Sequence, residues 1–501
     1  MKKLYRFSAI ALLVLPLVFT SCSDYLDRDD DDNITEADVF ARYEKVNGLV
    51  SDVYAAAKKA DRPLVFFEHF SNSAITDECE GTNVEGNITN NFNNGAWNPN
   101  SLPGSVGQYW EALYEGIRKA NLIIENVQKY NTPDNPQQDG DLRNRIGEMY
   151  FMRGYFHMLL LRMYGEAPYI DRVINAGDNM DFKKESVHSM VEKIVTDAQT
   201  AYGMVPNKYV KTSENFGRVD KGACLGLISF VRWVAATPLW NGASQYGYNL
   251  RRVFENEYAY DATRWRKAKE AAKAVLDFEV GGTKRYSLYT KHDANDFKDP
   301  ADGNLNDSRV YARLWDMFYD MDAFANEYVF FMTKSKDQAW QGDIYPPSRE
   351  GSSRQQPVQE QVDEYEYIVG DYGYPVYSAE ARKGGYDDTN PYVKGTRDPR
   401  FYRDVIYHGA PYRNNKNESK TINTASGSDK IGATNATTTG YYLRKFQQES
   451  WNKSGNFSIN APAIWRLPEF IYIYAEACNE LGEDIDEAYK LVNTVRERSF
   501  M

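Results

Sequence analysis

The chain has 501 residues, of which 42% are hydrophobic and 26% charged, and its formal net charge at pH 7 is −12. A negative charge of this size repels nucleic acid and anionic lipid headgroups, so nucleic-acid binding is excluded. The length suits two or three average domains or one large domain.

The first residues predict a secretory signal that ends at a lipidation site. Three cationic residues among the first six precede an uncharged apolar run over residues 9–19, and small residues then precede Cys22. The run is too short to span a bilayer, which needs about 20 apolar residues. This order is typical of a bacterial lipoprotein that is cut before Cys22 and acylated there. We therefore expect residues 1–21 to be a signal peptide and the acyl chains to hold the protein on a membrane surface.

Residues 22–36 are predicted to form an acidic, solvated tether, because the sequence SDYLDRDDDDN can bury little apolar surface. Three cysteines remain after lipidation, an odd number, and they predict no disulfide framework. Cys224 and Cys478 lie in apolar helical patterns and are expected to be buried. Cys79 lies in a polar stretch that reads as a loop, and the sequence assigns it no role.

Helical periodicity dominates the chain up to residue 280. A capping-type sequence starts at Thr35, with Asp38 at the third position after it. A period of 3.6 residues then predicts helices over residues 37–59, 109–130, 141–164, 186–202, 221–236 and 263–278. Paired helices joined by short turns are typical of tetratricopeptide-like stacks, although no strict period of about 34 residues is visible.

Residues 281–460 have a different character. They are rich in Gly, Pro, Asn, Asp and aromatic residues and lack periodicity, so they are predicted to be long loops. Loops of this length in a compact protein are usually functional or disordered, and the interleaved aromatic residues favour function. Helical periodicity returns over residues 470–481 and 485–496, with a turn at Gly482 between them.

The common catalytic motifs are absent from the sequence. The five histidines are far apart, which excludes the HExxH type of zinc site, and there is no G-x-S-x-G, P-loop or G-x-G-x-x-G motif. A glycosidase carboxylate pair stays open, because it is defined by distance in space. The densest acidic cluster of the loop-rich half, over residues 360–366, is better explained as a solvated helix face. No cofactor is predicted; Asp77, Glu78 and Glu80 can collect a structural calcium ion, although no EF-hand spacing supports one.

Nine segments of the chain follow one family pattern in order. They are SCSDYLD, YWEALYEGIRKANLIIENV, GEMYFMRGYFHMLLLRMYGEAPYI, GRVDKGACLGLISFVRWVAA, RWRKAKEAAKAVLDF, NEYVFFM, PVQEQVDEYE, RDPRFYRDVIYHG and APAIWRLPEFIYIYAEACNELGEDIDEAYKLVNTVRER. With them the chain resembles the SusD/RagB family of surface lipoproteins, the nutrient-binding partners of TonB-dependent outer-membrane transporters in the Bacteroidetes. Family members usually continue past the NTVRER helix, so an end at Met501 suggests a truncated or divergent member.

The resemblance implies an all-α fold of tetratricopeptide-like helical pairs with a large loop-rich half packed on the stack, and no catalysis. It implies one SusD-like domain over residues 37–501. Residues 37–280 would be mainly helical, residues 281–460 would be the ligand-binding half, and residues 461–501 would be a returning helical pair. The acidic tether resembles the signal that sends such lipoproteins to the outer leaflet of the outer membrane, so a cell-surface location is expected.

The resemblance also implies a ligand site of loop aromatics surrounded by polar side chains. A sugar ring packs its apolar C–H face on an aromatic ring, while its hydroxyls bond to amides and carboxylates. Two stretches fit this chemistry best. The first, residues 90–107, places Trp97 among Asn93, Asn94, Asn98 and Asn100; the second, residues 337–354, contains Trp340, Gln341, Asp343 and Tyr345. Trp315 is a further candidate, for which core packing is at least as good an explanation.

The leading expectation is thus a glycan-binding lipoprotein that captures an oligosaccharide and delivers it to a SusC-like TonB-dependent transporter. An oligopeptide-binding RagB-like member is the alternative within the family. A surface glycoside hydrolase and a purely structural subunit of the transporter complex are the alternatives from other classes.

Overall fold

The computed structural model describes residues 35–60, 70–82, 88–98, 100, 104–130, 136–209, 214–243, 254–291, 314, 316–318, 320–332, 342–393, 395–413, 419–447 and 463–499. The predicted signal peptide, Cys22 and nearly all of the tether lie outside the described residues. Of the predicted ligand-site residues, Trp315, Trp340 and Gln341 lie outside them as well.

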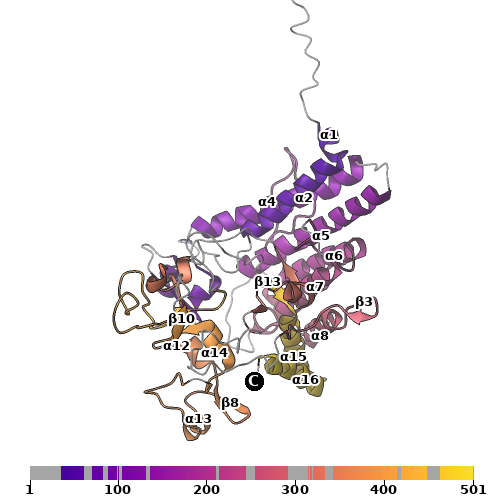
Figure 1. The fold of residues 1–501 in the computed structure, drawn as a ribbon. Coiled ribbons are helices and arrows are strands. Elements are labelled where there is room, and N and C mark those ends of the chain that lie inside the picture. Colours follow the sequence, from indigo (N-terminus) through magenta and orange to yellow (C-terminus); the bar gives the residue numbers. More distant parts are fainter. Residues whose placement is uncertain are drawn as a thin grey trace, which may run out of the picture.

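Eight long helices form a stack in which each helix packs against the next (Figure 1). They are α2 (Tyr43–Ala60), α4 (Gly104–Tyr130), α5 (Pro136–Tyr164), α6 (Val187–Met204), α7 (Lys221–Ala236), α8 (Ala262–Leu276), α15 (Leu467–Leu481) and α16 (Ile485–Arg498). The chain leaves the stack after α8 and returns to it at α15. The loop-rich half is therefore an insertion between two helices that touch each other.

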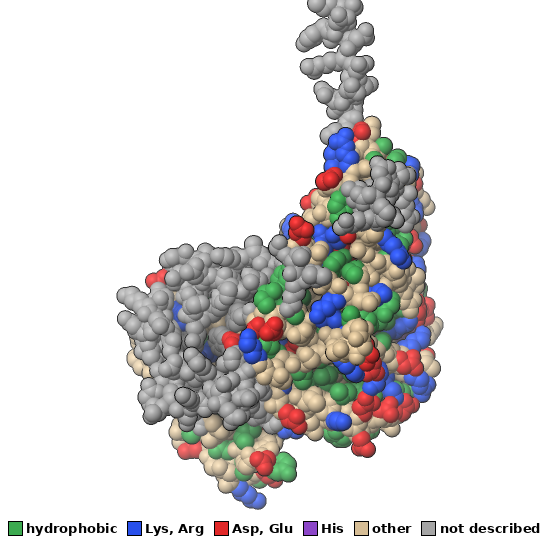
Figure 2. Space-filling view, turned by 45° about the vertical axis from the view of Figure 1, so that its right-hand side comes forward, with side chains coloured by type: hydrophobic (Ala, Val, Ile, Leu, Met, Phe, Trp, Pro, Cys, Tyr) green, Lys and Arg blue, Asp and Glu red, His purple; other side chains and the backbone are tan. Residues whose placement is uncertain are grey.

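Within the described residues, none of the helices combines the length and the apolar character that crossing a bilayer requires. On the face of the molecule turned forward in Figure 2, basic and acidic side chains are interspersed with hydrophobic ones.

Short elements make up the rest of the described chain. Before α8 these are α1 (Glu36–Phe40), η2 (Asn72–Ala74), β1 (Ile75–Thr76), β2 (Cys79–Gly81), α3 (Ile88–Asn93) and η4 (Glu255–Tyr258). Between α8 and α15 they are β3 (Glu279–Val280), β4 (Thr283–Lys284), α10 (Met321–Asn326), β5 (Tyr328–Phe331), η8 (Pro347–Arg349), β6 (Gln355–Pro357), α12 (Gln359–Asp363), β7 (Tyr367–Val369), β8 (Tyr372–Tyr374), α13 (Ala379–Lys383), α14 (Pro399–Asp404), β9 (Val405–Ile406), β10 (Pro411–Arg413), β11 (Ser419–Thr421), β12 (Tyr442–Leu443) and β13 (Ala463–Arg466).

The insertion is thus more regular than the sequence indicated. Its strands form antiparallel pairs, β3–β4, β5–β13, β7–β8, β9–β12 and β10–β11, while β6 joins β1 and β2 in a three-stranded sheet. The prediction of long loops over residues 281–460 is wrong for the strands from β4 to β12, because strands of two to four residues are too short to show an alternating pattern.

The helix predictions are confirmed with small changes at the ends. α7 has the predicted bounds, and Gly482 ends α15 in a left-handed conformation with φ of 65°. The predicted helix over residues 37–59 is in fact two helices, α1 and α2, with a break after Phe40. Thr35 caps α1 as expected: the Asp38 N–H donates to the Thr35 hydroxyl at 3.2 Å, and the Thr35 N–H donates to the Asp38 carboxylate at 3.0 Å.

Helix α5 lies at the centre of the stack, between α4 on one side and α6 on the other, and it also touches α2 and α7. The sequence predicted one apolar face for it. In the structure the consecutive residues Tyr155 and Phe156, and Met158 through Leu161, are all nearly inaccessible to solvent. A helix surrounded by other helices is apolar on all sides, which explains the departure from a single stripe.

A stripe of polar residues along α4 binds the extended backbone of residues 168–174. The Tyr114 hydroxyl donates to the Pro168 carbonyl at 2.8 Å, and Arg118 donates to the Ile174 carbonyl at 2.6 Å. Asn121 donates to the carbonyls of Ile170 and Arg172, which lie between these two in the chain, at 3.2 and 3.0 Å. The spacing of these side chains is that of one helix face. Side chains thereby satisfy backbone groups that a strand partner would otherwise bond.

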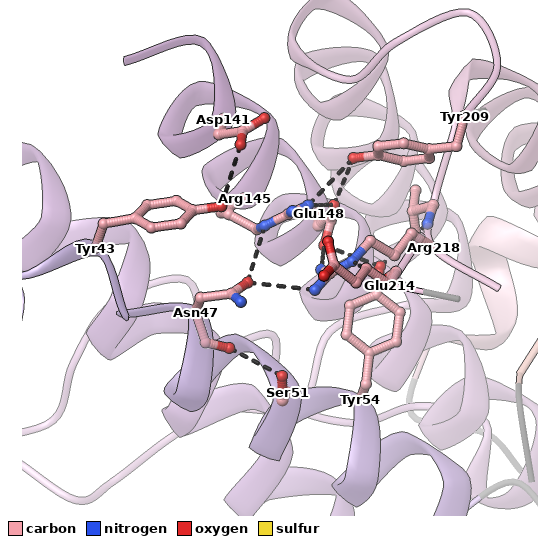
Figure 3. A network of polar contacts seen from close by, with 11 residues as sticks. Tyr43, Asn47, Ser51, Tyr54, Asp141, Arg145, Glu148, Tyr209, Glu214 and Arg218 are labelled. Atoms are coloured by element: carbon pink, nitrogen blue, oxygen red, sulfur yellow. Dashed lines mark hydrogen bonds and ion pairs between the residues drawn. The ribbon is translucent and has the colours of Figure 1, made fainter. Parts of the chain in front are cut away.

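A buried carboxylate connects α2, α5 and the segment before α7 (Figure 3). The side chain of Glu148 has no solvent exposure and forms ion pairs with Arg145 at 2.5 Å and Arg218 at 2.8 Å. The hydroxyls of Tyr54 and Tyr209 donate to the same carboxylate at 3.1 and 2.7 Å. All of its acceptor positions are therefore used, as the burial of a charge requires.

We expect Glu148→Ala to destabilise the protein by about 3–5 kcal/mol, because it leaves two guanidinium groups without their buried counter-ion. Urea unfolding followed by circular dichroism measures the change. Glu115→Ala is the matched control, since Glu115 forms an exposed ion pair with Lys119 and its loss should cost less than about 1 kcal/mol. Equal destabilisation by the two variants would contradict the role given to Glu148.

The buried imidazole of His157 is held in its neutral form. It stacks on Tyr169 with ring centres 3.7 Å apart. Its Nδ1 lies 2.8 Å from the Arg153 carbonyl, and its Nε2 accepts the Ile170 N–H at 3.0 Å, so Nδ1 carries the proton. If Nε2 also carried a proton, its N–H would point at the Ile170 N–H, and neither group would have an acceptor. Burial is the main cause that lowers the pKa of His157 to about 3.

His157 should therefore make stability depend on pH. Its pKa is lower in the folded than in the unfolded protein, so the stability it contributes is present above pH 6.5 and is lost as the pH falls towards 3. Between pH 7 and pH 5 the wild type should lose about 2 kcal/mol more than His157→Gln. Urea unfolding at both pH values measures the free energies. If the wild type and His157→Gln lost equal free energies of unfolding between pH 7 and pH 5, the low pKa given to His157 in the folded protein would be wrong.

Candidate functional site

A three-stranded sheet brings the two predicted ligand stretches together. β2 pairs with β6 in antiparallel register, with Glu80 opposite Gln356. Beyond the strand, the Thr82 N–H donates to the Arg354 carbonyl at 2.9 Å. α3 packs against β1 and β2 on the same sheet. Residues 88–98 and residues 342–357 are thus neighbours, although they are far apart in the chain.

Gln356 fixes this sheet to the rest of the insertion. Its side chain is fully buried, and its amide donates to the Thr82 hydroxyl at 2.6 Å and to the Ser353 carbonyl. Its amide oxygen accepts the Thr437 hydroxyl at 3.0 Å and the Thr438 N–H at 2.8 Å. A buried amide with all its groups bonded gives the sheet one defined position.

The turn after α3 directs Trp97 back towards the sheet. The Ala96 N–H donates to the Asn91 carbonyl at 2.8 Å, and the Gly95 N–H donates to the Phe92 carbonyl at 2.9 Å. Gly95 has φ of 69°, a conformation that costs a residue without a side chain little. This is a Schellman ending of a helix. The sequence NNGAW therefore encodes the placement of the tryptophan.

Trp97 and Phe92 form an aromatic pair on this part of the molecule. Their rings meet edge to face with centres 4.9 Å apart, and Trp97 also packs against buried Phe70 and Ala74. Trp97 is half-buried and 39% of Phe92 is exposed. Asn94 and Asn98 are exposed beside the pair. We call this region the Phe92–Trp97 surface; it combines an apolar ring surface with amides, the chemistry that sugar recognition uses.

The sequence did not single out Phe92. The signal that could have found it is the Asn-Gly helix ending between Phe92 and Trp97, because such a turn returns the chain towards the last turn of the helix.

Asp343 and Tyr345 lie inside the protein. The Asp343 carboxylate forms an ion pair with Arg354 at 3.2 Å, and only 11% of its side chain is exposed. Tyr345 is fully buried in a cluster with Phe401 and Tyr402, and a guanidinium from Arg349 lies 4.8 Å above its ring. The surrounding prolines and serines indicated an open loop, yet both side chains support the insertion from within. A ligand role for them, as for Trp97, Asn94 and Asn98, stays a prediction.

The structure shows where three of the four cysteines lie and how the acidic residues near the sheet are arranged. Cys224 and Cys478 are buried, as predicted. Cys79 lies in β2 rather than in a loop, and burial raises the pKa of its thiol to about 12, which makes it unreactive. Within the described part of the chain, no three acidic, His or Cys side chains come together to hold a metal ion, so the calcium hypothesis at Asp77, Glu78 and Glu80 gains no support.

Two cavities lie on the helical side of the molecule. One, of about 630 Å³, lies between the ends of α5 and α7 and includes Tyr164, Trp233 and Trp240 in its wall. The other, of about 590 Å³, lies between α4 and residues 170–180. Neither contains a residue that the sequence predicted for ligand binding.

Comparisons with known proteins agree with this fold. Residues 24–231 match a family model described as "Starch-binding associating with outer membrane", and residues 314–501 match the model of the SusD family. SusD-like protein P2 of Formosa agariphila is 24% identical over 202 residues, which are 40% of this chain and 38% of that protein. The match therefore spans well under half of the relative's length.

Solved structures extend the match to almost the whole chain. A SusD-like protein from Bacteroides fragilis NCTC 9343 is 20% identical, with a TM-score of 0.70, over 93% of this chain and 80% of that one. A SusD-like carbohydrate binding protein from the same organism is 15% identical, with a TM-score of 0.68, over 92% and 79%. The predicted all-α, tetratricopeptide-like fold is thus confirmed. With family models matching both its helical half and its insertion, the chain belongs to the SusD family.

Proposed function

We propose that this protein binds an oligosaccharide at the Phe92–Trp97 surface and passes it to a SusC-like TonB-dependent transporter. The observation that carries the proposal is the partly exposed pair of Phe92 and Trp97, flanked by Asn94 and Asn98 beside the three-stranded sheet. Membership of the SusD family supports glycan binding in general. Binding without catalysis fits the absence of catalytic motifs in the sequence.

We further propose that the protein is held on the cell surface through acyl chains on Cys22. The order of charged, apolar and small residues before Cys22 supports lipidation. The description of the matching family model, which refers to the outer membrane, supports the location. Each acyl CH₂ that enters the bilayer contributes about 0.8 kcal/mol, so two or three chains suffice for stable attachment.

Trp97→Ala should lower the affinity for a bound glycan about tenfold, since it removes both ring contact and buried area. Isothermal titration calorimetry against a panel of neutral and acidic oligosaccharides measures the effect. Tyr489→Ala is the matched control, because Tyr489 is 68% exposed on α16 and should not affect binding. Trp240→Ala tests the aromatic cavity of the helical side.

The outcomes separate the candidate functions. Unchanged affinity in Trp97→Ala together with a loss in Trp240→Ala would move the site to the helical cavity. New reducing ends after incubation with the glycans would identify a hydrolase. Binding of peptides and of no glycan would favour an oligopeptide-binding member of the family.

A further inference from the structure

Four basic side chains converge where the insertion meets the returning helical pair. Arg403 belongs to α14, Lys445 follows β12, Arg466 ends β13 and Arg498 ends α16. Figure 1 shows α14 on the side of the insertion that faces α15 and α16. We call this group of four residues the basic junction.

Two touching aromatic rings define the geometry of the basic junction. The guanidinium carbons of Arg403 and Arg466 each lie 5.4 Å from the centre of the Phe318 ring. Phe318 meets Phe446 edge to face at 4.5 Å, and the Lys445 ammonium lies 5.3 Å from the centre of Phe446. Three cations thus surround one pair of rings. Such contacts attract each cation without cancelling its charge.

Carboxylates neutralise only part of this charge. Asp404 pairs with Arg403 at 2.6 Å and also accepts the Tyr365 hydroxyl at 2.8 Å. Glu327, which is fully buried, pairs with Arg466 at 3.2 Å and with Arg498 at 2.9 Å. Two paired carboxylates therefore face four cations.

One further acid lies close to the basic junction without removing the surplus. Glu469 faces Arg466, but burial raises the pKa of Glu469 to about 7, so it carries only part of a charge at neutral pH. The basic junction consequently holds more positive than negative charge among the described residues.

Lys445 carries the positive charge that no carboxylate of the basic junction pairs with. It is partly buried and forms no ion pair with any residue that the structure describes. Burial is the main cause that lowers the pKa of Lys445; the charge of Asp404 raises it, and the like charges of Arg403 and Arg466 lower it. Arg498 adds a buried Nε–H that has no hydrogen-bond partner among the described residues. A buried cation without a counter-ion, as at Lys445, destabilises a folded protein unless an anion joins it.

We propose that the basic junction binds an oxyanion, a carboxylate or a sulfate group, carried by a sugar unit of the ligand. Lys445 and Arg466 are the contacting residues, because their side chains are only partly buried whereas Arg403 and Arg498 are almost completely enclosed. Guanidinium and ammonium groups form strong, charge-assisted hydrogen bonds with oxyanions. The inference rests on the proposed glycan binding and narrows it to acidic oligosaccharides.

The position of Lys445 supports a sugar-borne anion. β12, which ends two residues before Lys445, contacts β6 of the three-stranded sheet. The charge of Glu78, in the β1–β2 turn of that sheet, acts on Lys445. The same sheet carries the Phe92–Trp97 surface. The net charge of −12 does not prevent binding, because exposed charges are screened beyond about 8 Å at physiological ionic strength.

The test uses two trisaccharides that differ only at C6, α-1,4-galacturonotriose and α-1,4-galactotriose, with calorimetry on the full chain. The wild type should bind the acidic trisaccharide about tenfold more tightly, as expected for one charge-assisted contact. Lys445→Gln should abolish this preference and Lys445→Arg should keep it. Lys430→Gln is the matched control, since Lys430 is an exposed lysine of the insertion and its loss changes the net charge equally.

A second measurement separates binding from a structural role. Without ligand, Lys445→Gln should melt at the same temperature as the wild type or higher, because burial disfavours the charged ammonium group and the change removes that charge. A lower melting temperature, with the preference for the acidic trisaccharide retained in the folded fraction, would overturn the inference.

The remaining outcomes distinguish this inference from the proposed function. Equal affinity for the two trisaccharides, or binding of other neutral glycans only, would overturn the oxyanion site and leave glycan binding intact. Absence of any glycan binding would overturn both. In that case, stabilisation of the wild type by sodium sulfate at constant ionic strength, lost in Lys445→Gln, would identify an adventitious ion only.

Discussion

The architecture depends on the antiparallel pairing of β5 with β13, which closes the stack around the insertion. β13 is the last element before α15, whereas β5 lies in the first part of the insertion, and the Leu467 N–H that begins α15 donates to the Glu327 carbonyl just before β5. Phe330 of β5 then packs its ring against Phe151 and Tyr155 of the central helix α5. One strand pair thereby ties the insertion to the core of the helical stack.

Buried polar groups hold the two halves of the molecule in different ways. In the helical stack, Glu148 uses all of its acceptor positions on two arginines and two tyrosines, and the α4 stripe satisfies backbone carbonyls one by one. In the insertion, the neutral side-chain amide of Gln356 has all of its groups hydrogen-bonded and so fixes the three-stranded sheet. The basic junction stands apart from these networks, because Lys445 forms no ion pair with any residue that the structure describes. Networks that are fully satisfied specify a fold, whereas an unbalanced one is a place where a further group can bind.

The sequence predicted the helices well and the insertion poorly, and the reason lies in the range of the contacts. α7 could be placed residue by residue, because its period, its Asp220 cap and its end are all local. β2 and β6 are short and find each other across most of the chain, as the contact between Thr82 and Gln356, 274 positions apart, illustrates. The turn-forming neighbours of Tyr345 predicted that its ring lies in an exposed loop, yet the ring is fully buried in the core of the insertion. The four residues of the basic junction come from four separate parts of the chain, so no local sequence pattern predicts that they meet.

The insertion between α8 and α15 also has a consequence for the order of folding. Trp265 and Ala268 on α8 are buried against Ala477 of α15, a helix that is synthesised only after the whole insertion. The first six helices of the stack can assemble from neighbouring segments of the chain. The apolar face of α8, by contrast, can be buried only when α15 reaches it. Contacts of such sequence separation form slowly. This face of α8 therefore stays open until the whole insertion and α15 have been synthesised, and in that interval its apolar side chains are exposed to aggregation.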